Sequence, residues 1–222
     1  LGCYARRDEA IRRVFPDYRE GDRYKIAIAG ELLDRDRASV FDLVVEGADG
    51  TQRRTRLPLD AYLQLVAATN MKQRTRKLLE YHAAERRNYA VIGTPNRLEF
   101  EQGFFVRGGD GLADVKPIAH LYKTQVYALA AWLAVPAAIR AEPPSTDTYS
   151  LPQTQEEFFF ALPYGELDLL LWARRHAVPV AEVGAVMSLL PEQVERAFRD
   201  IDKKRLAAAR LHQPALLVET VP

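Results

Sequence analysis

The sequence has one cysteine, few histidines and no long apolar run. Cys3 cannot form a disulfide within the chain, and no Cys-x-x-Cys or Cys/His cluster indicates a zinc site. The four histidines show no His-x-x-x-His spacing. No apolar stretch approaches the ~20 residues of a membrane span, and the first residues do not have the pattern of a signal peptide. We therefore predict a cytoplasmic protein without a zinc site or a membrane partner.

The chain also lacks a charge excess of either sign. Its 31 Lys+Arg and 30 Asp+Glu leave a net charge of +1, so no global field attracts nucleic acid or an anionic membrane. An apolar fraction of 48% is sufficient for a hydrophobic core. At ~150 residues for an average domain, a chain of 222 residues suits one large domain or two small ones. Partners must be inferred from local motifs.

The first third of the chain mixes helical and β patterns. Helices are predicted over residues 4–15 and 23–33, with a turn between them. Residues 38–57 contain a β-branched run, a central Gly-Ala-Asp-Gly and a run with alternating Thr and Arg, which predict a β-hairpin inserted on the main fold. A helix follows over residues 59–87, with a break expected at residues 68–70.

The rest of the chain indicates an α/β fold. Residues 89–93, Tyr-Ala-Val-Ile-Gly, are typical of a short buried strand, and the helices expected on either side favour a βα arrangement. Apolar residues with helical spacing predict a helix that begins at Lys123. A proline-rich loop follows, and residues 156–211 are predicted to be mostly helical, with Pro191 at a helix start.

The glycine-rich run between this strand and Lys123 contains candidate site residues. Ligands in α/β sheets bind beyond the carboxyl ends of strands, where Thr94 lies, and Glu99 could hold Mg²⁺. Glycines near Arg107 and Asp114 let a backbone approach a ligand closely. Lys123, at a helix start with exposed amides, is suited to phosphate. Each of these residues alone also fits an ordinary solvated side chain.

Taken together, four segments in this order resemble a known family. They are ATNMKQRTR, YAVIGTPNRLE, GFFVRGGDGLADVKPIAHLYKTQV and VPAAIRAEPPSTD. The order and separations resemble those of the NAD synthetases of the N-type ATP pyrophosphatase superfamily, from about residue 70 to 147 and more loosely to Lys204. The resemblance implies a single domain over residues 1–222 with a doubly wound, mostly parallel sheet of the adenine nucleotide alpha hydrolase type and additional C-terminal helices.

The resemblance also implies roles for individual residues. Residues that correspond to ATP contacts are Thr94, Lys123 and Ser145. Lys123 is also the implied catalytic residue, and Glu99 corresponds to the Mg²⁺ ligand. Residues that correspond to contacts with deamido-NAD are Arg74, Arg107, Asp114, Lys203 and Lys204. Arg107 stands where lysine is common, and Ser145 stands where threonine is common. The two C-terminal lysines fit a solvated helix face equally well.

The implied activity is ATP-dependent amidation of deamido-NAD to NAD, with Mg²⁺ as the metal cofactor. The acid is activated as an acyl adenylate with release of pyrophosphate, and ammonia, or ammonia derived from glutamine, then displaces AMP. The resemblance implies a homodimer and no nucleic-acid partner. ATP, deamido-NAD and ammonia are the implied ligands.

Three alternatives stay open from the sequence. The family's pyrophosphate loop, Ser-Gly-Gly-x-Asp-Ser, does not occur in these residues; we expect it to precede Leu1, although an inactive homologue would also lack it. A related ATP pyrophosphatase with another acid substrate would share the same motifs. Residues 178–205 have the pattern of a helix-turn-helix, but its second helix begins with two acids, which is unfavourable for reading DNA.

Overall fold

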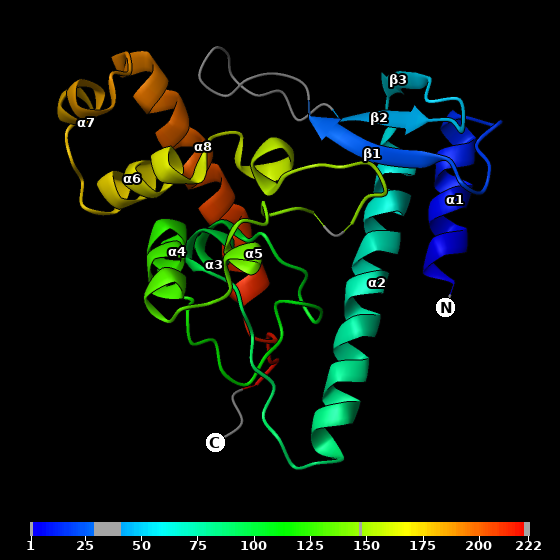
Figure 1. The fold of residues 1–222 in the computed structure, drawn as a ribbon, viewed down its shortest axis with the longest axis horizontal. Coiled ribbons are helices and arrows are strands. Elements are labelled where there is room, and N and C mark those ends of the chain that lie inside the picture. Colours follow the sequence, from blue (N-terminus) through cyan, green and yellow to red (C-terminus); the bar gives the residue numbers. More distant parts are fainter. Residues whose placement is uncertain (1, 29–40, 147, 220–222) are drawn as a thin grey trace.

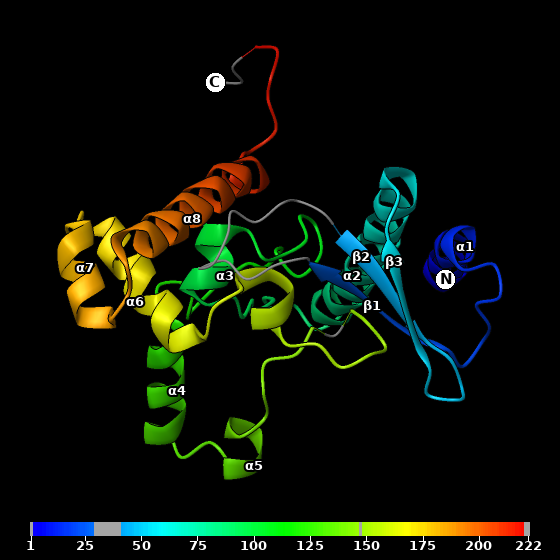
Figure 2. The same cartoon turned by 90° about the horizontal axis from the view of Figure 1, so that it is seen from above.

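The structure is a computed structural model that describes residues 2–28, 41–146 and 148–219. Three strands, β1 (Arg23–Ile28), β2 (Phe41–Glu46) and β3 (Gln52–Arg56), form one antiparallel sheet in the order β1-β2-β3. The helices are α1 (Cys3–Val14), α2 (Leu59–Glu85), α3 (Arg97–Gln102), α4 (Lys123–Trp132), α5 (Ala137–Arg140), α6 (Tyr164–Arg175), α7 (Val180–Met187) and α8 (Pro191–His212), with a π-helix at Glu156–Phe160. Figures 1 and 2 show two lobes: a sheet lobe of α1, the strands and the upper part of α2, and a helical lobe of α3 to α8.

The core of the sheet lobe lies between the sheet and helices α1 and α2. Alternate residues of a strand share one face, and Tyr24 and Ile26 of β1 lie beside Leu43 of β2 on the face toward the helices. Ile11 of α1 and Leu65 of α2 complete this layer, and all five side chains are almost fully buried. Burial of each contributes about 1.5–3 kcal/mol of transfer free energy, which holds the two helices on the sheet.

Strands β2 and β3 pair as a hairpin within the range expected for one. Residues 47–50 form the turn, in which Gly50 has a φ of 78° and donates to the carbonyl of Gly47 at 2.9 Å. Asp49 Oδ1 accepts from the amide of Thr51 at 2.9 Å, which fixes the return of the chain. The first residues of the expected hairpin range lie outside the described residues, and its status as an insertion stays a prediction.

The prediction of a helix over residues 23–33 is wrong for the part that is described. Residues 23–28 form β1, because Tyr24 and Ile26 alternate with polar or small residues and bury one face against the core. The outer edge of β1 is also paired: Tyr24 accepts from the amide of Leu151 at 3.0 Å, and Ile26 accepts from the side chain of Gln153 at 2.9 Å. Contacts distant in sequence therefore decide the conformation here. Residues 29–33 lie outside the described residues.

Helix α2 is continuous, so the break expected at residues 68–70 is also wrong. The hydroxyl of Thr69 donates a hydrogen bond to the carbonyl of Val66 at 2.9 Å, so this polar side chain has a hydrogen-bond partner within the helix. Ala68 is buried against the neighbouring elements. Although α2 has 27 residues, neither it nor any other helix of the described ranges is long and apolar enough to cross a membrane.

The helical lobe has its own core, centred on α6 and α8. Its largest buried side chains include Phe160, Leu167, Leu170 and Ile201. Helix α8 begins at Pro191 as predicted, and its predicted buried residues are indeed buried: Val194, Ala197, Phe198 and Ile201. The predicted helix at Lys123 is confirmed as α4. The predicted proline-rich loop before residue 156 is confirmed as well, because no helix or strand begins or ends in its described part.

The prediction of a short buried strand at residues 89–93 is wrong in its extent: Ile92 forms one isolated bridge, and of these residues Val91 and Gly93 are buried. Ile92 pairs with Val115 in the parallel direction, and the amide of Gly93 donates to the carbonyl of Val115 at 2.8 Å. Ile92 is 54% exposed and Val115 is 48% exposed, so no further strand of the described ranges covers this pair. The fold is α/β, and the sheet that the described residues form is antiparallel.

Candidate functional site

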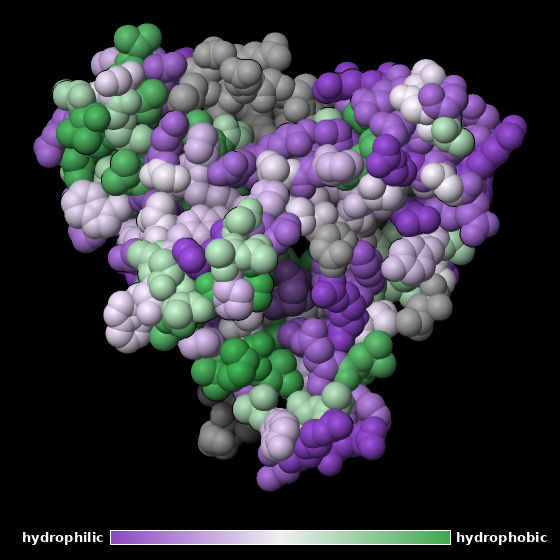
Figure 3. All heavy atoms as spheres, in the orientation of Figure 1, coloured by the Kyte–Doolittle hydropathy of each residue, from purple (hydrophilic) through white to green (hydrophobic). Residues whose placement is uncertain are grey.

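A cleft of about 900 Å³ lies between the two lobes and contains several predicted site residues. Its walls come from α2, residues 103–110, residues 145–159 and α8, and Figure 3 shows a hollow near the centre of the view, between the helical lobe and α2. We call it the central cleft. Its lining includes five cationic residues, Arg76, Arg196, Arg199, Lys203 and Lys204. The acids in the lining are Asp110 and Asp200, so the local charge favours an anionic ligand.

Lys203 and Lys204 both line the central cleft, but they differ in how they are held. The ammonium of Lys204 lies 2.5 Å from Asp200 Oδ2 and donates to the carbonyl of Phe159 at 2.8 Å. It also lies over the Phe159 ring, 4.9 Å from the centroid. Lys203 is exposed. Lys204 therefore ties α8 to the π-helix beside the cleft, whereas Lys203 is accessible to a ligand.

Ser145 also lines the central cleft. It is exposed and pairs with Thr154 in an isolated antiparallel bridge, next to a hydrogen bond from the amide of Thr146 to the carbonyl of Gln153 at 3.0 Å. These backbone contacts hold the backbone of Ser145 against residues 153–154. Asp147, which completes the predicted Ser-Thr-Asp segment, lies outside the described residues.

Glu99 and Lys123 lie close enough to interact electrostatically. Glu99 belongs to the first turn of α3, where its Oε2 accepts from the amide of Asn96 at 2.8 Å while Asn96 Oδ1 accepts from the amide of Glu99 at 3.2 Å. Burial raises the pKa of the Glu99 carboxyl, against the opposing effects of the Asn96 amide and the Lys123 ammonium. The ammonium of Lys123 lies over the rings of Tyr127 and Tyr164 at 5.4 and 5.3 Å.

The amides at the start of α4 are not open to a phosphate, contrary to the sequence-based expectation. Asp168 of α6 accepts from the amide of Thr124 at 2.7 Å and from the amide of Lys123 at 3.3 Å. Its side chain is buried, with 5% of the residue exposed. Asp168 thus neutralises the positive end of the helix, and only the side chain of Lys123 remains to meet an anion.

The structure brings Arg74 and Arg107 together through a backbone contact. Arg74 Nε donates to the carbonyl of Arg107 at 3.1 Å. The guanidinium of Arg107 in turn donates to the carbonyls of Gln213 at 2.8 Å and Arg210 at 3.4 Å. Arg107 therefore stabilises the carboxyl end of α8, a common role for a cation at that position.

Asp114 has a structural role at the other end of the same loop. Its Oδ2 accepts from the amide of Val91 at 2.7 Å, and its Oδ1 accepts from the hydroxyl of Tyr81 at 3.1 Å. The sequence-based expectation was that the glycines of this loop let a ligand approach the backbone, but at Gly111 the structure places a side chain of the protein in that space. A Cβ on Gly111 would collide with the ring of Phe105, so this glycine permits close packing within the protein.

Thr94 is exposed and lies two residues after the bridge at Ile92. It is not among the residues that line the central cleft. Sequence reasoning did not single out Gln155 and Tyr164. The hydroxyl of Tyr164 donates to Gln155, which hydrogen-bonds to Glu99 and also lines the cleft. Asp110 is a third residue not singled out, although its position inside the Gly-Gly-Asp-Gly turn was a usable signal.

A metal site must be built around one carboxylate here. Within residues 2–28, 41–146 and 148–219, no three His, Cys, Asp or Glu side chains gather in an arrangement that could hold a metal ion. Mg²⁺ needs only one or two carboxylates when phosphate and water supply its other ligands. Glu99 fits that requirement, because a metal ion bound beside its half-buried carboxyl would favour the ionised form of that carboxyl.

The two lobes and the cleft between them, lined by five cationic and two acidic residues, are those of an α/β protein with a cationic cleft. The family model for NAD synthase matches residues 42–207. The chain therefore belongs to the NAD synthase family.

Relatives of known name agree with this membership. The chain is 54% identical over 221 residues to the NH(3)-dependent NAD(+) synthetase of Rhizobium rhizogenes, which covers 100% of this chain and 66% of that protein. It is 52% identical over 220 residues to the protein of the same name from Mesorhizobium japonicum, covering 99% of this chain and 69% of the relative. The chain thus spans about two thirds of the length of these relatives.

A solved structure supports the α/β assignment. The NMN synthetase from Francisella tularensis is 28% identical, with a TM-score of 0.55 over 70% of this chain and 58% of that structure.

Proposed function

We propose that this chain carries the site of a NAD synthase, which uses ATP to convert deamido-NAD to NAD. The observation that carries the proposal is the 54% identity, along the whole chain, to a protein named NH(3)-dependent NAD(+) synthetase. The central cleft supports it, because deamido-NAD is a dinucleotide with two phosphates and five cationic residues line the cleft.

The chemistry proceeds in two steps. A carboxylate oxygen of the nicotinate attacks the α-phosphorus of ATP, the bond to the β-phosphate oxygen breaks, and pyrophosphate leaves. Ammonia then attacks the acyl carbon of the adenylate, AMP leaves, and the nitrogen loses a proton to give the amide. Negative charge builds on phosphate oxygens in the first step, and Lys123 is the cation that we assign to stabilise it. Thr94 and Ser145 are the hydroxyl residues that we assign to ATP.

Mg²⁺ supplies charge neutralisation at the ATP phosphates when it is bound. Glu99 is the residue that would hold it. Its Oε2 accepts from the amide of Asn96, and the side chain of Gln155 also hydrogen-bonds to the carboxyl, so a cation would take the remaining lone pairs of the carboxylate. The single carboxylate fits a metal whose remaining ligands are phosphate and water.

The dinucleotide is assigned to the cationic residues near α2 and α8. The residues proposed to position it are Arg74, Arg107, Asp114, Lys203 and Lys204. Because the guanidinium of Arg107 and the carboxylate of Asp114 have partners within the chain, we assign them mainly to shaping the loop. A homodimer, a cytoplasmic location and a doubly wound parallel sheet around the Ile92–Val115 bridge complete the proposal.

One different substrate has a specific observation in its favour. The structural neighbour from Francisella tularensis is named as an NMN synthetase, so the corresponding acid, a mononucleotide, is the alternative substrate to test. The higher identity to proteins named NAD synthetases favours the dinucleotide.

Chromatographic product analysis tests the function. The protein, its mass verified, is incubated with Mg-ATP, ammonium and either deamido-NAD or nicotinate mononucleotide, and binding of each acid is measured separately by calorimetry. We expect NAD and AMP in equal amounts with deamido-NAD. Failure to bind deamido-NAD would refute the proposal, and binding of both substrates without NAD formation would favour an inactive homologue.

Two matched variants examine the role of Lys123. Lys123→Met keeps the aliphatic stem between the two tyrosine rings and removes the charge, and we expect NAD formation to fall at least about 100-fold. Lys25→Met is the control, because Lys25 pairs with Glu157 at 2.7 Å on the surface of β1. An equal loss in both variants would contradict a specific role for Lys123.

A further inference from the structure

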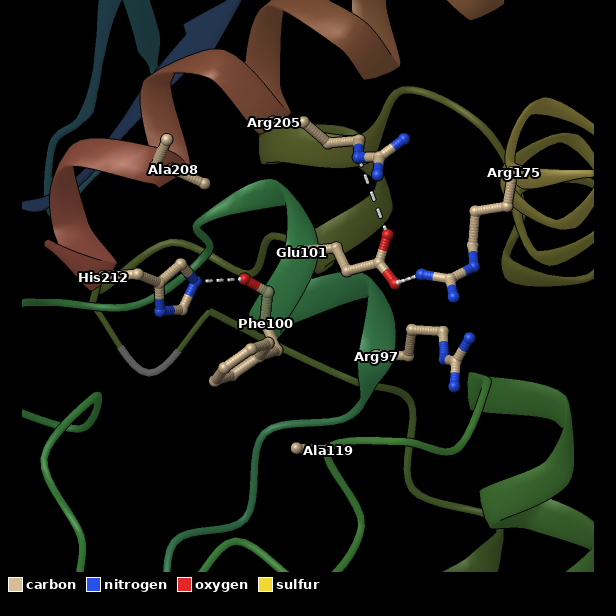
Figure 4. Close-up of a pocket in the computed structure, with 9 residues that line it drawn as sticks. Arg97, Phe100, Glu101, Ala119, Arg175, Arg205, Ala208 and His212 are labelled. Carbon is tan, nitrogen blue, oxygen red and sulfur yellow. Dashed lines mark hydrogen bonds and ion pairs between the residues drawn. The ribbon is translucent and has the colours of Figure 1, made fainter.

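A second pocket, separate from the central cleft, lies where α3, α6 and α8 meet. It has a volume of about 430 Å³, and Figure 4 shows the residues around it. Three arginines from three different helices line it: Arg97 of α3, Arg175 of α6 and Arg205 of α8. None of its lining residues lines the central cleft, and different residues of α8 line the two hollows.

Two of the three arginines lie beside the acid of the pocket, Glu101. Glu101 Oε1 lies 2.5 Å from Arg175 Nη1, and Glu101 Oε2 lies 3.7 Å from Arg205 Nε. The longer distance exceeds that of a hydrogen bond, and Oε2 is buried without a hydrogen-bond partner. No other carboxylate of the described residues pairs with these arginines, so the pocket keeps an excess of two positive charges.

Contacts outside the pocket hold Arg97 in place. Its Nε donates to the carbonyl of His120 at 2.9 Å, and its guanidinium lies over the ring of Tyr122, 4.8 Å from the centroid. Both Nη groups remain available for a further acceptor. A guanidinium fixed in this way loses little conformational entropy when it binds an anion.

The remaining wall gives the pocket its space. Ala119, Ala208 and Ala209 are small, and the rings of Phe100 and His212 are in contact, with centroids 4.2 Å apart and planes tilted by 40°. His212 Nε2 donates to the carbonyl of Phe100 at 2.8 Å, which holds the imidazole against α3. Small and flat side chains beside three forked donors leave room for a compact ligand with several acceptor oxygens.

We propose that this pocket binds a small oxyanion of the phosphate class. Planar guanidinium groups match the oxygen geometry of phosphate, and an excess positive charge that no acid of the described chain neutralises favours an anion over a neutral ligand. Free phosphate or pyrophosphate and the phosphate group of a nucleotide share this chemistry. The proposal does not depend on the activity assigned to the central cleft.

Calorimetric titration of the protein with inorganic phosphate, pyrophosphate and AMP, at one fixed low ionic strength, tests the proposal. We expect saturable binding, weakened about tenfold or more by Arg97→Gln and by Arg205→Gln. Glu101→Gln removes the acid among the described residues that line the pocket and is expected to tighten binding. Arg13→Gln on α1, where Arg13 pairs with exposed Glu9 at 2.7 Å, is the matched control and should bind as the wild type does.

The variants also separate the two hollows. Thermal unfolding confirms that each variant is folded before its affinity is compared. If Lys203→Gln lowers the affinity while Arg97→Gln and Arg205→Gln do not, the anion binds in the central cleft and the proposal is overturned. Absence of binding at millimolar phosphate and pyrophosphate would overturn it as well. Tighter binding of AMP than of phosphate would identify a nucleotide as the source of the anion.

Discussion

Asp168 is expected to be the acid with the largest single effect on the stability of the helical lobe. It is 5% exposed and accepts from the amides of Thr124 and Lys123 at 2.7 and 3.3 Å. Hydrogen bonds to a charged group contribute about 1.5–3 kcal/mol each, and the longer one is weak. Asp168→Ala should therefore lower the free energy of unfolding by about 3 kcal/mol. Asp168→Asn keeps one acceptor and loses the charge, so about 1 kcal/mol is expected.

Urea denaturation followed by circular dichroism measures these losses. Asp202→Ala is the matched control, because Asp202 pairs with Arg174 at 2.6 Å but is exposed to solvent, and such pairs contribute about 1 kcal/mol or less. If Asp168→Ala cost no more than Asp202→Ala, the capping of α4 by α6 would not be a source of stability. NAD formation should fall with Asp168→Ala at temperatures where the protein stays folded, since the backbone of Lys123 would lose its anchor.

Two further predictions concern Glu99 and Gly103. Because burial raises the pKa of Glu99 in the folded protein, its contribution to stability is present below pH 4.5, the ordinary value, and is lost as the pH rises through the raised pKa. Urea unfolding at a series of pH values should show a smaller loss of stability with rising pH in Glu99→Gln than in the wild type. An equal pH dependence in the two proteins would contradict the raised pKa of Glu99. Gly103 has a φ of 77°, and an added Cβ would lie 2.9 Å from Ala208 Cβ, so Gly103→Ala should cost about 2–4 kcal/mol. Gly21→Ala, with a φ of 99° and open space, should cost about 1 kcal/mol in the same assay, and equal losses would refute the packing argument.

Local patterns were enough to predict the elements whose periodicity and packing agree. Helix α8 combines a proline start with buried residues at helical spacing, and it was predicted correctly. Strand β1 was not, because Arg23–Ile28 is short and its alternation is visible only over three pairs. Its conformation depends on β2 and on Gln153, which lies more than a hundred residues away. A local pattern cannot contain that information.

The same limit applies to the candidate site. The glycine-rich segment and Lys123 could be selected from the sequence because they are close together in the chain. Asp168 could not, since it reaches the start of α4 from a helix 44 residues further on and no spacing rule connects them. Gln155 and Tyr164 were missed for the same reason, because tertiary packing alone brings them beside Glu99.

The family motif also encodes more than ligand contacts. Asp114 holds the amide of Val91, Arg107 holds the end of α8, and Glu99 caps α3. The contacts that the structure shows for these motif residues are contacts within the protein, which fold the loop. Loss of activity on substitution of these residues therefore does not by itself identify a ligand contact. Affinity has to be measured beside stability, and Lys203, exposed in the cleft, is the position where the two effects separate most clearly.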